Sequence, residues 1–373
     1  MPSQLHRVLT AAVLVAALLL SSLSAVSATA QTDPTAAPTA AAETVPETVP
    51  DTAPETVPET VPETVPETEA PTEPEEDPSP AVLPADPDSA IYQICDSIMQ
   101  NSEARHVIVY HTGTGQVLYS KTVGNGKVFP ASTTKLFSCY VALQYLDPDT
   151  VITAGSELEL VPDGSSIAWI GKGAQLRVKM LVEAMMLPSG NDAAIILATA
   201  AGRVIAQDEL LAPADAVQVF VDEMNRQAEL LGFEKSHFTS PDGWHSGSHY
   251  TCLNDLARIA ALALQNDTIR RYMKLGRHET YFYSGQAITW ENTNLLVLPG
   301  SGFYRSDANG MKTGYTRPAG YSVMASFAYE EGDIVIGLFG YVDKTARFTD
   351  AINLSKAVKQ QLRLEAQSDK SVG

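Results

Sequence analysis

Three short polar motifs, far apart in the 373-residue chain, carry side chains that could do covalent chemistry. Ser132 and Lys135 lie three residues apart at the start of an apolar run that follows Pro130, and this spacing places both on one face of a helix. A serine hydroxyl becomes a good nucleophile when a nearby base accepts its proton. A lysine amine is such a base when it is neutral, and burial, a helix N-terminus or a second cation lowers its pKa. The spacing therefore predicts a serine nucleophile activated by lysine.

The other two motifs lie where the chain is expected to form loops or strand ends beside a cleft. Ser189 and Asn191 flank Gly190 in a loop that ends an apolar helix, and Lys312 opens a Lys-Thr-Gly motif in a strand predicted over residues 310–316. Ser-x-x-Lys alone is a weak signal, because ordinary residue usage gives roughly one match in a chain of this length. Together and in this order, the three motifs match the set found in penicillin-binding proteins and class A β-lactamases.

The sequence around the motifs resembles the D-alanyl-D-alanine carboxypeptidases of peptidase family S11, which are low-molecular-mass penicillin-binding proteins. The resemblance is carried by residues 129–135, 187–194, 224–238 and 312–321, and it extends over about residues 88–365. It implies a serine-type hydrolase that removes the terminal D-alanine from peptidoglycan stem peptides through an acyl-enzyme on Ser132. It also implies inhibition by β-lactam antibiotics, with no cofactor and no metal.

The same resemblance implies a role for each motif residue. Lys135 would take the proton of Ser132, while Ser189 and Asn191 would relay protons and hold the substrate amide. Lys312 would add positive potential and help to keep Lys135 neutral. The implied substrate-binding residues are Lys312, Thr313, Gly314, Tyr315 and Arg347: Thr313 and Arg347 would bind the terminal carboxylate, and the backbone N–H groups of Ser132 and Tyr315 would form an oxyanion hole.

Three other functions compete with this interpretation. A class A β-lactamase needs a glutamate to activate the deacylating water, and the Glu-x-x-Leu-Asn pattern is missing from the middle of the chain. A non-catalytic, penicillin-sensing or wall-binding module would not need the intact Ser132, Lys135 and Lys312. Endopeptidase action on cross-links would use the same residues as carboxypeptidase action, so both stay open.

The elements that must position these motifs indicate an α/β (α+β) fold. An alternating pattern predicts a hairpin over residues 106–121, and two strands joined by a turn are predicted over 320–329 and 333–341. Helical patterns cover 90–99, about 347–364 and much of 130–270. Strands near both ends imply an antiparallel sheet assembled from N- and C-terminal segments and flanked by helices. This architecture is β-lactamase/transpeptidase-like: the helical middle forms an inserted lobe, and a cleft lies between lobe and sheet.

The N-terminal quarter has a different composition. Residues 1–30 read as a signal peptide with an apolar core and an Ala-Thr-Ala cleavage pattern, although an uncleaved membrane anchor stays open. Residues 31–87 repeat Glu-Thr-Val-Pro, and proline at every fourth position prevents a packed core, which predicts a disordered stalk. The catalytic domain would then span 88–373. We expect an exported protein on the extracellular, cell-wall or periplasmic side, tethered to a membrane only if the signal is retained.

The net charge and a few cysteine, histidine and aspartate residues bear on the remaining functional alternatives. The formal net charge is -19, and residues 31–90 hold 15 acids without Lys or Arg, which argues against a nucleic-acid binder. Three cysteines cannot build a disulfide framework, so buried thiols are expected. His245 and His249 are expected in a surface loop rather than in a metal site, because Gly243 and Gly247 would break a helix there. Asp192 is expected to cap the helix that follows it.

Overall fold

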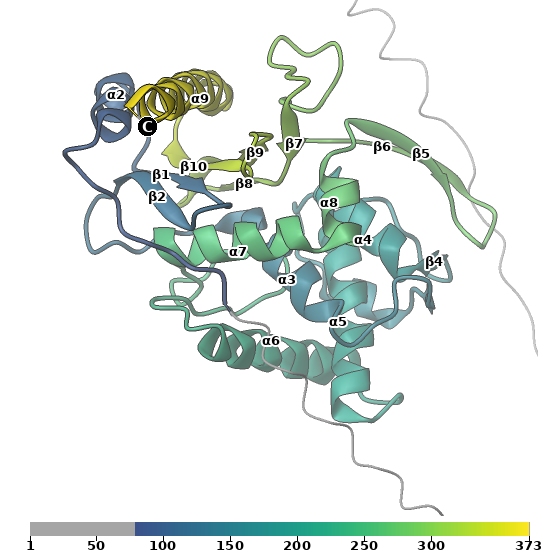
Figure 1. Ribbon diagram of the computed structural model, residues 1–373. Helices are drawn as coiled ribbons and strands as arrows, with labels where there is room; N and C mark the ends of the chain where they lie inside the picture. The colour runs from purple at the N-terminus through teal and green to yellow at the C-terminus, as the bar shows by residue number, and fades with distance from the viewer. Residues whose placement is uncertain (1–78, 373) are drawn as a thin grey trace, which may run out of the picture. The chain divides into compact units, whose positions relative to one another are not determined.

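A six-stranded antiparallel sheet joins the two ends of the folded region in this computed structural model, which describes residues 79–372 (Figure 1). The strand order is β2-β1-β10-β9-β7, and β8 also pairs with β9. The predicted assembly of the sheet from N- and C-terminal segments is confirmed, because β1 pairs with β10 from His106↔Phe339 to His111↔Ile334. The strands are β1 His106–His111, β2 Gln116–Lys121, β7 Ala308–Gly310, β8 Thr313–Thr316, β9 Gly320–Phe327 and β10 Ile334–Tyr341.

Helices cover both faces of the sheet. The helices α2 Ala90–Met99 and α9 Ala346–Val372 lie on one face, and α7 Leu253–Gln265 contacts β1 and β10 from the other (Figure 1). All eight residues of β10 are buried, so this central strand is apolar throughout rather than alternating. Its side chains therefore contribute to two cores: Ile336 and Leu338 pack with α2 and α9, while Val335 and Phe339 pack with the helical region.

In the sequence, the helical region lies between the N-terminal strands β1 and β2 and the C-terminal strands β7 to β10. The helix α3 passes through its centre and contacts α4, α5, α6, α7 and α8. Two small hairpins complete it, β3 Val151–Thr153 with β4 Gln175–Arg177 and β5 Arg277–Tyr281 with β6 Ala287–Glu291. The remaining helices are α3 Thr134–Ala142, α4 Val178–Met186, α5 Asn191–Ala206, α6 Pro213–Leu230 and α8 Asp267–Met273, with short 3₁₀ helices η1 Ala131–Thr133 and η2 Ser156–Leu160.

The folded region begins before the predicted boundary at residue 88. Residues 79–84, which we call the strap, already contact the domain: Ser79 Oγ donates to Leu231 O (2.7 Å), and Leu83 N donates to Gly115 O (2.7 Å). Val117 N in turn donates to Leu83 O (2.9 Å) at the edge of β2. The strap was expected within the stalk because its prolines hid these contacts. The predicted signal peptide and stalk residues 31–78 lie outside the described residues.

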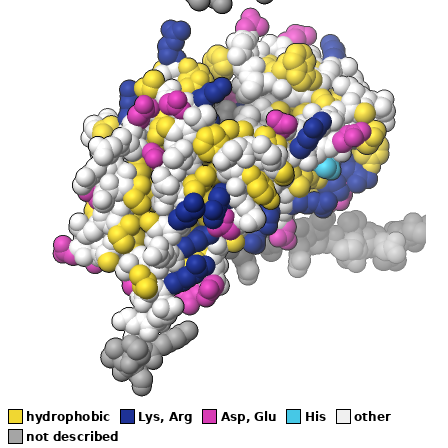
Figure 2. Space-filling view, turned by 90° about the horizontal axis from the view of Figure 1, so that it is seen from above, with side chains coloured by type: hydrophobic (Ala, Val, Ile, Leu, Met, Phe, Trp, Pro, Cys, Tyr) yellow, Lys and Arg dark blue, Asp and Glu magenta, His cyan; other side chains and the backbone are white. Residues whose placement is uncertain are grey.

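Three further expectations concern membrane-spanning helices, the charge of the surface and the state of the cysteines. In the described residues 79–372, no helix is long and apolar enough to span a bilayer. The face that carries α9 mixes Lys and Arg with Asp and Glu (Figure 2), unlike the one-sign basic patch of a nucleic-acid binder. The thiols are free as predicted, with Cys95 and Cys139 buried and Cys252 half-buried.

Candidate active site

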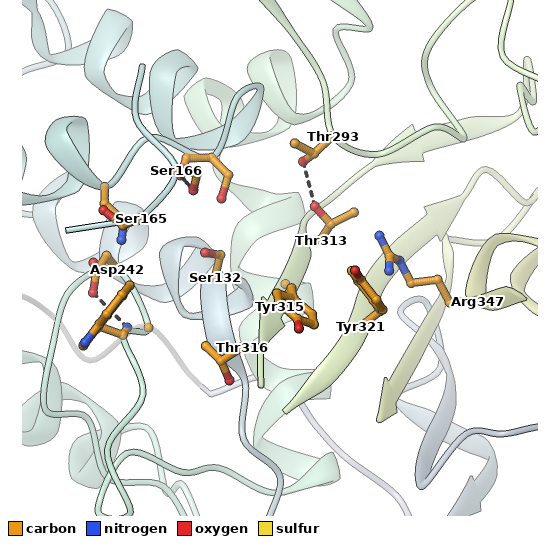
Figure 3. A pocket seen from close by; sticks show the side chains of 16 residues that line it. Ser132, Ser165, Ser166, Asp242, Thr293, Thr313, Tyr315, Thr316, Tyr321 and Arg347 are labelled. Carbon is orange, nitrogen blue, oxygen red and sulfur yellow. Dashed lines mark hydrogen bonds between the residues drawn. The ribbon is translucent and has the colours of Figure 1, made fainter. Parts of the chain in front are cut away.

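The predicted nucleophile lies at the start of the central helix. Ser132 is in η1, and α3 begins two residues later, so Lys135 is one turn further on the same side. Ala131 has a left-handed backbone (φ 49°), which redirects the chain just before Ser132. Ser132 lines a cleft of about 310 Å³ between the helical region and β8 (Figure 3). The cleft is lined by Ser132, residues 164–166, Ser189, Asn191, residues 242–244, Thr293, residues 313–316, Tyr321 and Arg347.

The buried amine of Lys135 has three hydrogen-bond partners. Its Nζ lies 3.0 Å from Ser132 Oγ, 2.8 Å from Asn191 Oδ1 and 2.9 Å from Asp242 O. Two of these partners are carbonyl oxygens, which only accept hydrogen bonds. A neutral amine has two N–H donors and one lone pair, so it satisfies both carbonyls and turns its lone pair toward the serine hydroxyl. The geometry therefore suits transfer of the Ser132 proton to Lys135.

Burial makes the neutral amine accessible near physiological pH. Loss of solvation lowers the pKa of Lys135 to about 8, although the nearby Asp242 carboxylate acts in the opposite direction. Lys312 is also fully buried, and its Nζ donates to Thr313 O (3.0 Å). Burial, followed by the charges of Lys135 and Arg347, holds the pKa of Lys312 well below its ordinary value. The charge of Lys135 thus disfavours a positive charge on Lys312 in the same site.

The second motif joins the first through a rigid loop. Ser189 has a left-handed backbone (φ 66°) and lines the cleft, and Asn191 begins α5. Ser166 fixes this loop from the facing segment, because its Oγ donates to Ser189 O (2.8 Å) and its carbonyl accepts from Asn191 N (2.8 Å). Asn191 thus reaches Lys135, whereas the Ser189 hydroxyl forms no hydrogen bond with Ser132 or Lys135 in the described part of the chain.

The third motif forms the opposite wall, but its strand is not continuous as predicted. Met311 has a left-handed backbone (φ 87°), which separates β7 from β8 and turns Lys312 into the protein. Lys312 and Met324 exchange both backbone hydrogen bonds (3.1 and 2.8 Å). Because hydrogen-bonded pairs alternate along antiparallel strands, the N–H of Tyr315, three residues on, points away from β9 into the cleft.

Close packing brings this strand against the nucleophile. A Cβ on Gly314 would lie 2.9 Å from Pro130 O and 3.3 Å from Ser132 N, so a side chain there would push the strand away. The N–H of Tyr315 and that of Ser132 thus come from two segments in contact, as an oxyanion hole requires. Thr313 lies beside them, and its Oγ1 shares a 2.6 Å hydrogen bond with Thr293 Oγ1.

Arg347 supplies a buried cation at the far end of the same wall. It is the second residue of α9, and its guanidinium lies over the rings of Tyr321 (5.1 Å) and Phe348 (4.7 Å). The side chain is buried, yet its Nε and Nη1 have no hydrogen-bond partner. Burial lowers the pKa of the guanidinium to about 10. Unpartnered buried donors are unfavourable, so they mark a place where an anionic ligand would be stabilised.

The family model for the D-alanyl-D-alanine carboxypeptidases of peptidase family S11 matches residues 95–338, more than half of the chain. The chain belongs to this family. In this S11 family member, Ser132, Ser189, Asn191 and Thr313 line one cleft, and Lys135 and Lys312 are buried next to it.

Individual relatives are distant. The S11 carboxypeptidase of Streptomyces sp. (strain K15) is 31% identical over 259 residues, covering 65% of this chain and 83% of the relative. The carboxypeptidase DacF of Bacillus subtilis is 29% identical over 232 residues, and the match covers 60% of this chain but only 54% of DacF. The crystal structure of the Streptomyces K15 DD-transpeptidase superimposes with a TM-score of 0.61 at 29% identity, covering 69% of this chain and 97% of that one. The transpeptidase-like fold predicted from the sequence is therefore confirmed.

Sequence reasoning missed one loop of this S11 site. The carbonyl of Asp242 accepts from Lys135, and the next residue, Gly243, packs so tightly that a Cβ would lie 1.9 Å from Ala131 O. The sequence Pro241-Asp242-Gly243 does indicate a turn at this position. In the structure Gly243 has a φ of 80°, which glycine adopts readily.

One expectation about nearby polar residues was wrong, and a second was incomplete. His249 is not on the surface: it is buried, with Nε2 2.9 Å from Thr134 Oγ1, and burial lowers its pKa to about 4. Residues 79–372 contain no cluster of three metal-binding side chains. Asp192 lies within the first turn of α5 and accepts hydrogen bonds from Ala168 N (2.8 Å) and Ile170 N (3.0 Å). It therefore anchors a neighbouring loop as well as its own helix.

Proposed function

We propose that this S11 family member is an exported serine D-alanyl-D-alanine carboxypeptidase that removes the terminal D-alanine from peptidoglycan stem peptides. The observation that carries the proposal is the 3.0 Å contact between Ser132 Oγ and the buried amine of Lys135, whose pKa is lowered to about 8. A neutral lysine accepts the serine proton while the serine oxygen attacks the carbonyl of the penultimate D-alanine. The resulting tetrahedral oxygen receives hydrogen bonds from the N–H groups of Ser132 and Tyr315.

The proton then passes from Lys135 to the departing amine of the terminal D-alanine, which leaves Ser132 as an acyl ester. Asn191 holds Lys135 through its Oδ1 and leaves its side-chain N–H₂ for the substrate amide. Water attacks the ester in the second half of the reaction, and Lys135 again serves as the base. Ser189 lines the cleft beside this path and is proposed to relay protons.

The opposite wall is proposed to bind the substrate. The unpartnered donors of Arg347, together with the Thr313 hydroxyl, suit the terminal carboxylate of the peptide. Lys312 lies beside them, and an anion bound nearby favours its charged form. In the described residues β8 pairs only with β9, so Thr313, Gly314 and Tyr315 leave a free edge along which an extended peptide can add as a strand.

The proposal of export rests on the sequence of residues 1–30 and on the acidic, proline-rich residues 31–78. The cleaved signal would release the domain on the extracellular or cell-wall side, whereas a retained signal would tether it. Mass spectrometry of the N-terminus of the secreted protein distinguishes the two, and retention in the cytosol would contradict export.

The central test uses the full chain with labelled penicillin. We expect a long-lived adduct that peptide mass spectrometry locates on Ser132, and release of one D-alanine per stem pentapeptide. The Ser132→Ala variant should lose both. Failure to form any adduct would favour a non-catalytic binding module, and rapid release of hydrolysed penicillin would favour a β-lactamase.

Transfer to an amine is a second candidate, because the superimposed Streptomyces K15 structure is described as a DD-transpeptidase. The acyl-enzyme on Ser132 would be the same, and only the acceptor would change from water to an amino group. Adding a glycine-based amine acceptor to the assay separates the two: a new peptide product indicates transfer, whereas tetrapeptide alone indicates hydrolysis.

A further inference from the structure

The ends of the cleft have different chemistry. Arg347 lies at one end and Ser165 and Asp242 at the other, with Ser132 between them (Figure 3). This inference rests on the proposed function, in which the terminal carboxylate lies at Arg347 and the scissile carbonyl at Ser132. The remainder of the stem peptide must then leave the cleft past Ser165 and Asp242. Any further binding site for the substrate is expected at that end.

Two loops that contribute to the cleft wall each carry an exposed tryptophan. Trp244 follows Asp242 and Gly243 in the cleft wall and is 43% exposed. Trp169 is 72% exposed, although its neighbours Ala168 and Ile170 are buried. Its backbone is left-handed (φ 62°), which costs a bulky residue about 1–2 kcal/mol. A strained backbone that turns a large apolar side chain into solvent indicates a constraint other than folding.

The loop around Trp169 is held rigidly on both sides. Asp192 accepts hydrogen bonds from Ala168 N and Ile170 N, and Trp290 Nε1 donates to Ala168 O (3.0 Å). The backbone on both sides of Trp169 is thus tied to α5 and to β6 by hydrogen bonds. Such an attachment lowers the entropy lost when a ligand stacks on the indole.

The position of Trp169 matches the reach of the substrate. Ser166 lines the cleft three residues earlier, so the Cα atoms of Ser166 and Trp169 are at most about 11 Å apart. The stem peptide is joined to a glycan strand at its N-terminus, and four extended residues before the scissile bond span about 13 Å. The reach of a peptide that leaves past Ser165 is therefore sufficient to bring its first sugar ring to this indole.

We propose that Trp169 is a stacking platform for a sugar ring of the glycan strand that carries the stem peptide. One face of a pyranose presents C–H groups that suit the flat indole, while its hydroxyl groups stay in water. Trp244, closer to Ser132 in the wall, contacts the peptide itself. The enzyme thereby distinguishes stem peptides on glycan from free peptides.

The test measures binding in full-length Ser132→Ala protein by calorimetry with two probes. One is a stem pentapeptide ending in D-Ala-D-Ala, and the other is the same peptide linked to an N-acetylglucosaminyl-N-acetylmuramyl disaccharide. We expect the disaccharide probe to bind about five- to tenfold more tightly. Adding Trp169→Gly should reduce this ratio to about one, whereas Trp169→Tyr should keep most of it.

The glycine variant separates binding from folding. Glycine adopts a φ of 62° without strain, so its melting temperature should be equal to or above that of the parent. Leu210→Ala is the matched control, because Leu210 is 92% exposed and follows the C-terminal end of α5, a 16-residue helix about 24 Å long that begins at Asn191. It should leave the ratio unchanged, and Trp244→Ala should weaken both probes equally.

Equal affinities for the two probes in the parent protein, or a preference that survives Trp169→Gly, would overturn the sugar platform. D-Alanine release is measured separately with Ser132 restored. Absence of release from both probes would overturn the proposed carboxypeptidase activity, while the affinity ratio would still decide the role of Trp169.

Discussion

The two walls of the cleft differ in how complete they are without a ligand. On the helical wall, Lys135 Nζ has hydrogen-bond partners in Ser132, Asn191 and Asp242. On the sheet wall, two nitrogens of Arg347 have no partner and β8 has a free edge in the described part of the chain. The helical wall holds the groups for chemistry in place beforehand, whereas the sheet wall is completed by what it binds. Changes in the first wall should therefore affect the rate of acylation, and changes in the second should affect substrate affinity.

The largest effect is expected from Lys135→Met. Removing the base should slow acylation of Ser132 by penicillin about 10²–10⁴-fold. The melting temperature should also fall, because Asn191 Oδ1 and Asp242 O lose the donor that Lys135 supplies. Stopped-flow acylation measures the rate, and Lys359→Met, which removes another buried lysine paired with Asp307, is the control and should acylate normally. Near-normal acylation by Lys135→Met would show that the helical wall does not supply the base.

The pH dependence should follow the same lysine. With a pKa of about 8, the neutral fraction of Lys135 rises about 50-fold from pH 6 to pH 8, and the acylation rate should rise with it. Since the ordinary value is 10.5, the unfolded chain binds more protons than the folded one between about pH 8 and 10.5, so this residue makes stability rise with pH there. Rates of penicillin acylation from pH 6 to 10 provide the measurement, and a flat profile would contradict a titrating base.

Arg347→Met should affect the sheet wall alone. The KM for peptides ending in D-Ala-D-Ala should rise about ten- to thirtyfold, because a charge-assisted contact with the carboxylate is lost. Acylation by an ester that lacks this carboxylate should stay unchanged. The melting temperature should be equal or higher, since the unpartnered Nε and Nη1 are removed from the interior. Equal losses with both substrates would assign Arg347 to the structure of the cleft instead.

The smallest change in rate is expected from Gly243→Ala. A Cβ there would lie 1.9 Å from Ala131 O at a φ of 80°, so the variant should lose about 2–4 kcal/mol of stability. Displacement of Asp242 O from Lys135 should slow acylation only a few-fold. The matched control is Gly247→Ala in the same loop, where no atom lies within 4 Å. Urea unfolding and acylation rates test both, and equal stability of the two variants would contradict the steric argument.

The sequence was sufficient for the parts of the site that rest on local patterns. Ser132 and Lys135 share one helical turn, and the strand patterns near both ends predicted the sheet correctly. The missing parts depend on contacts between distant segments. Lys135 and Asp242 are 107 residues apart, and no periodicity relates them. The break at Met311 was missed for a similar reason, since Lys312 is turned inward by tertiary packing and a left-handed backbone at a residue that rarely adopts one.

The strap bears on how the domain would carry mechanical load. Its two attachments lie on different halves of the molecule: Ser79 on Leu231 at the end of α6, and Leu83 on the edge of β2. A force applied from the N-terminal side therefore reaches both halves first through a few hydrogen bonds and the packing of Val82. We expect force spectroscopy between Ser79 and the end of α9 to show release of the strap as a separate, low-force step. A single rupture of the whole domain would mean that the strap bears load as strongly as the sheet.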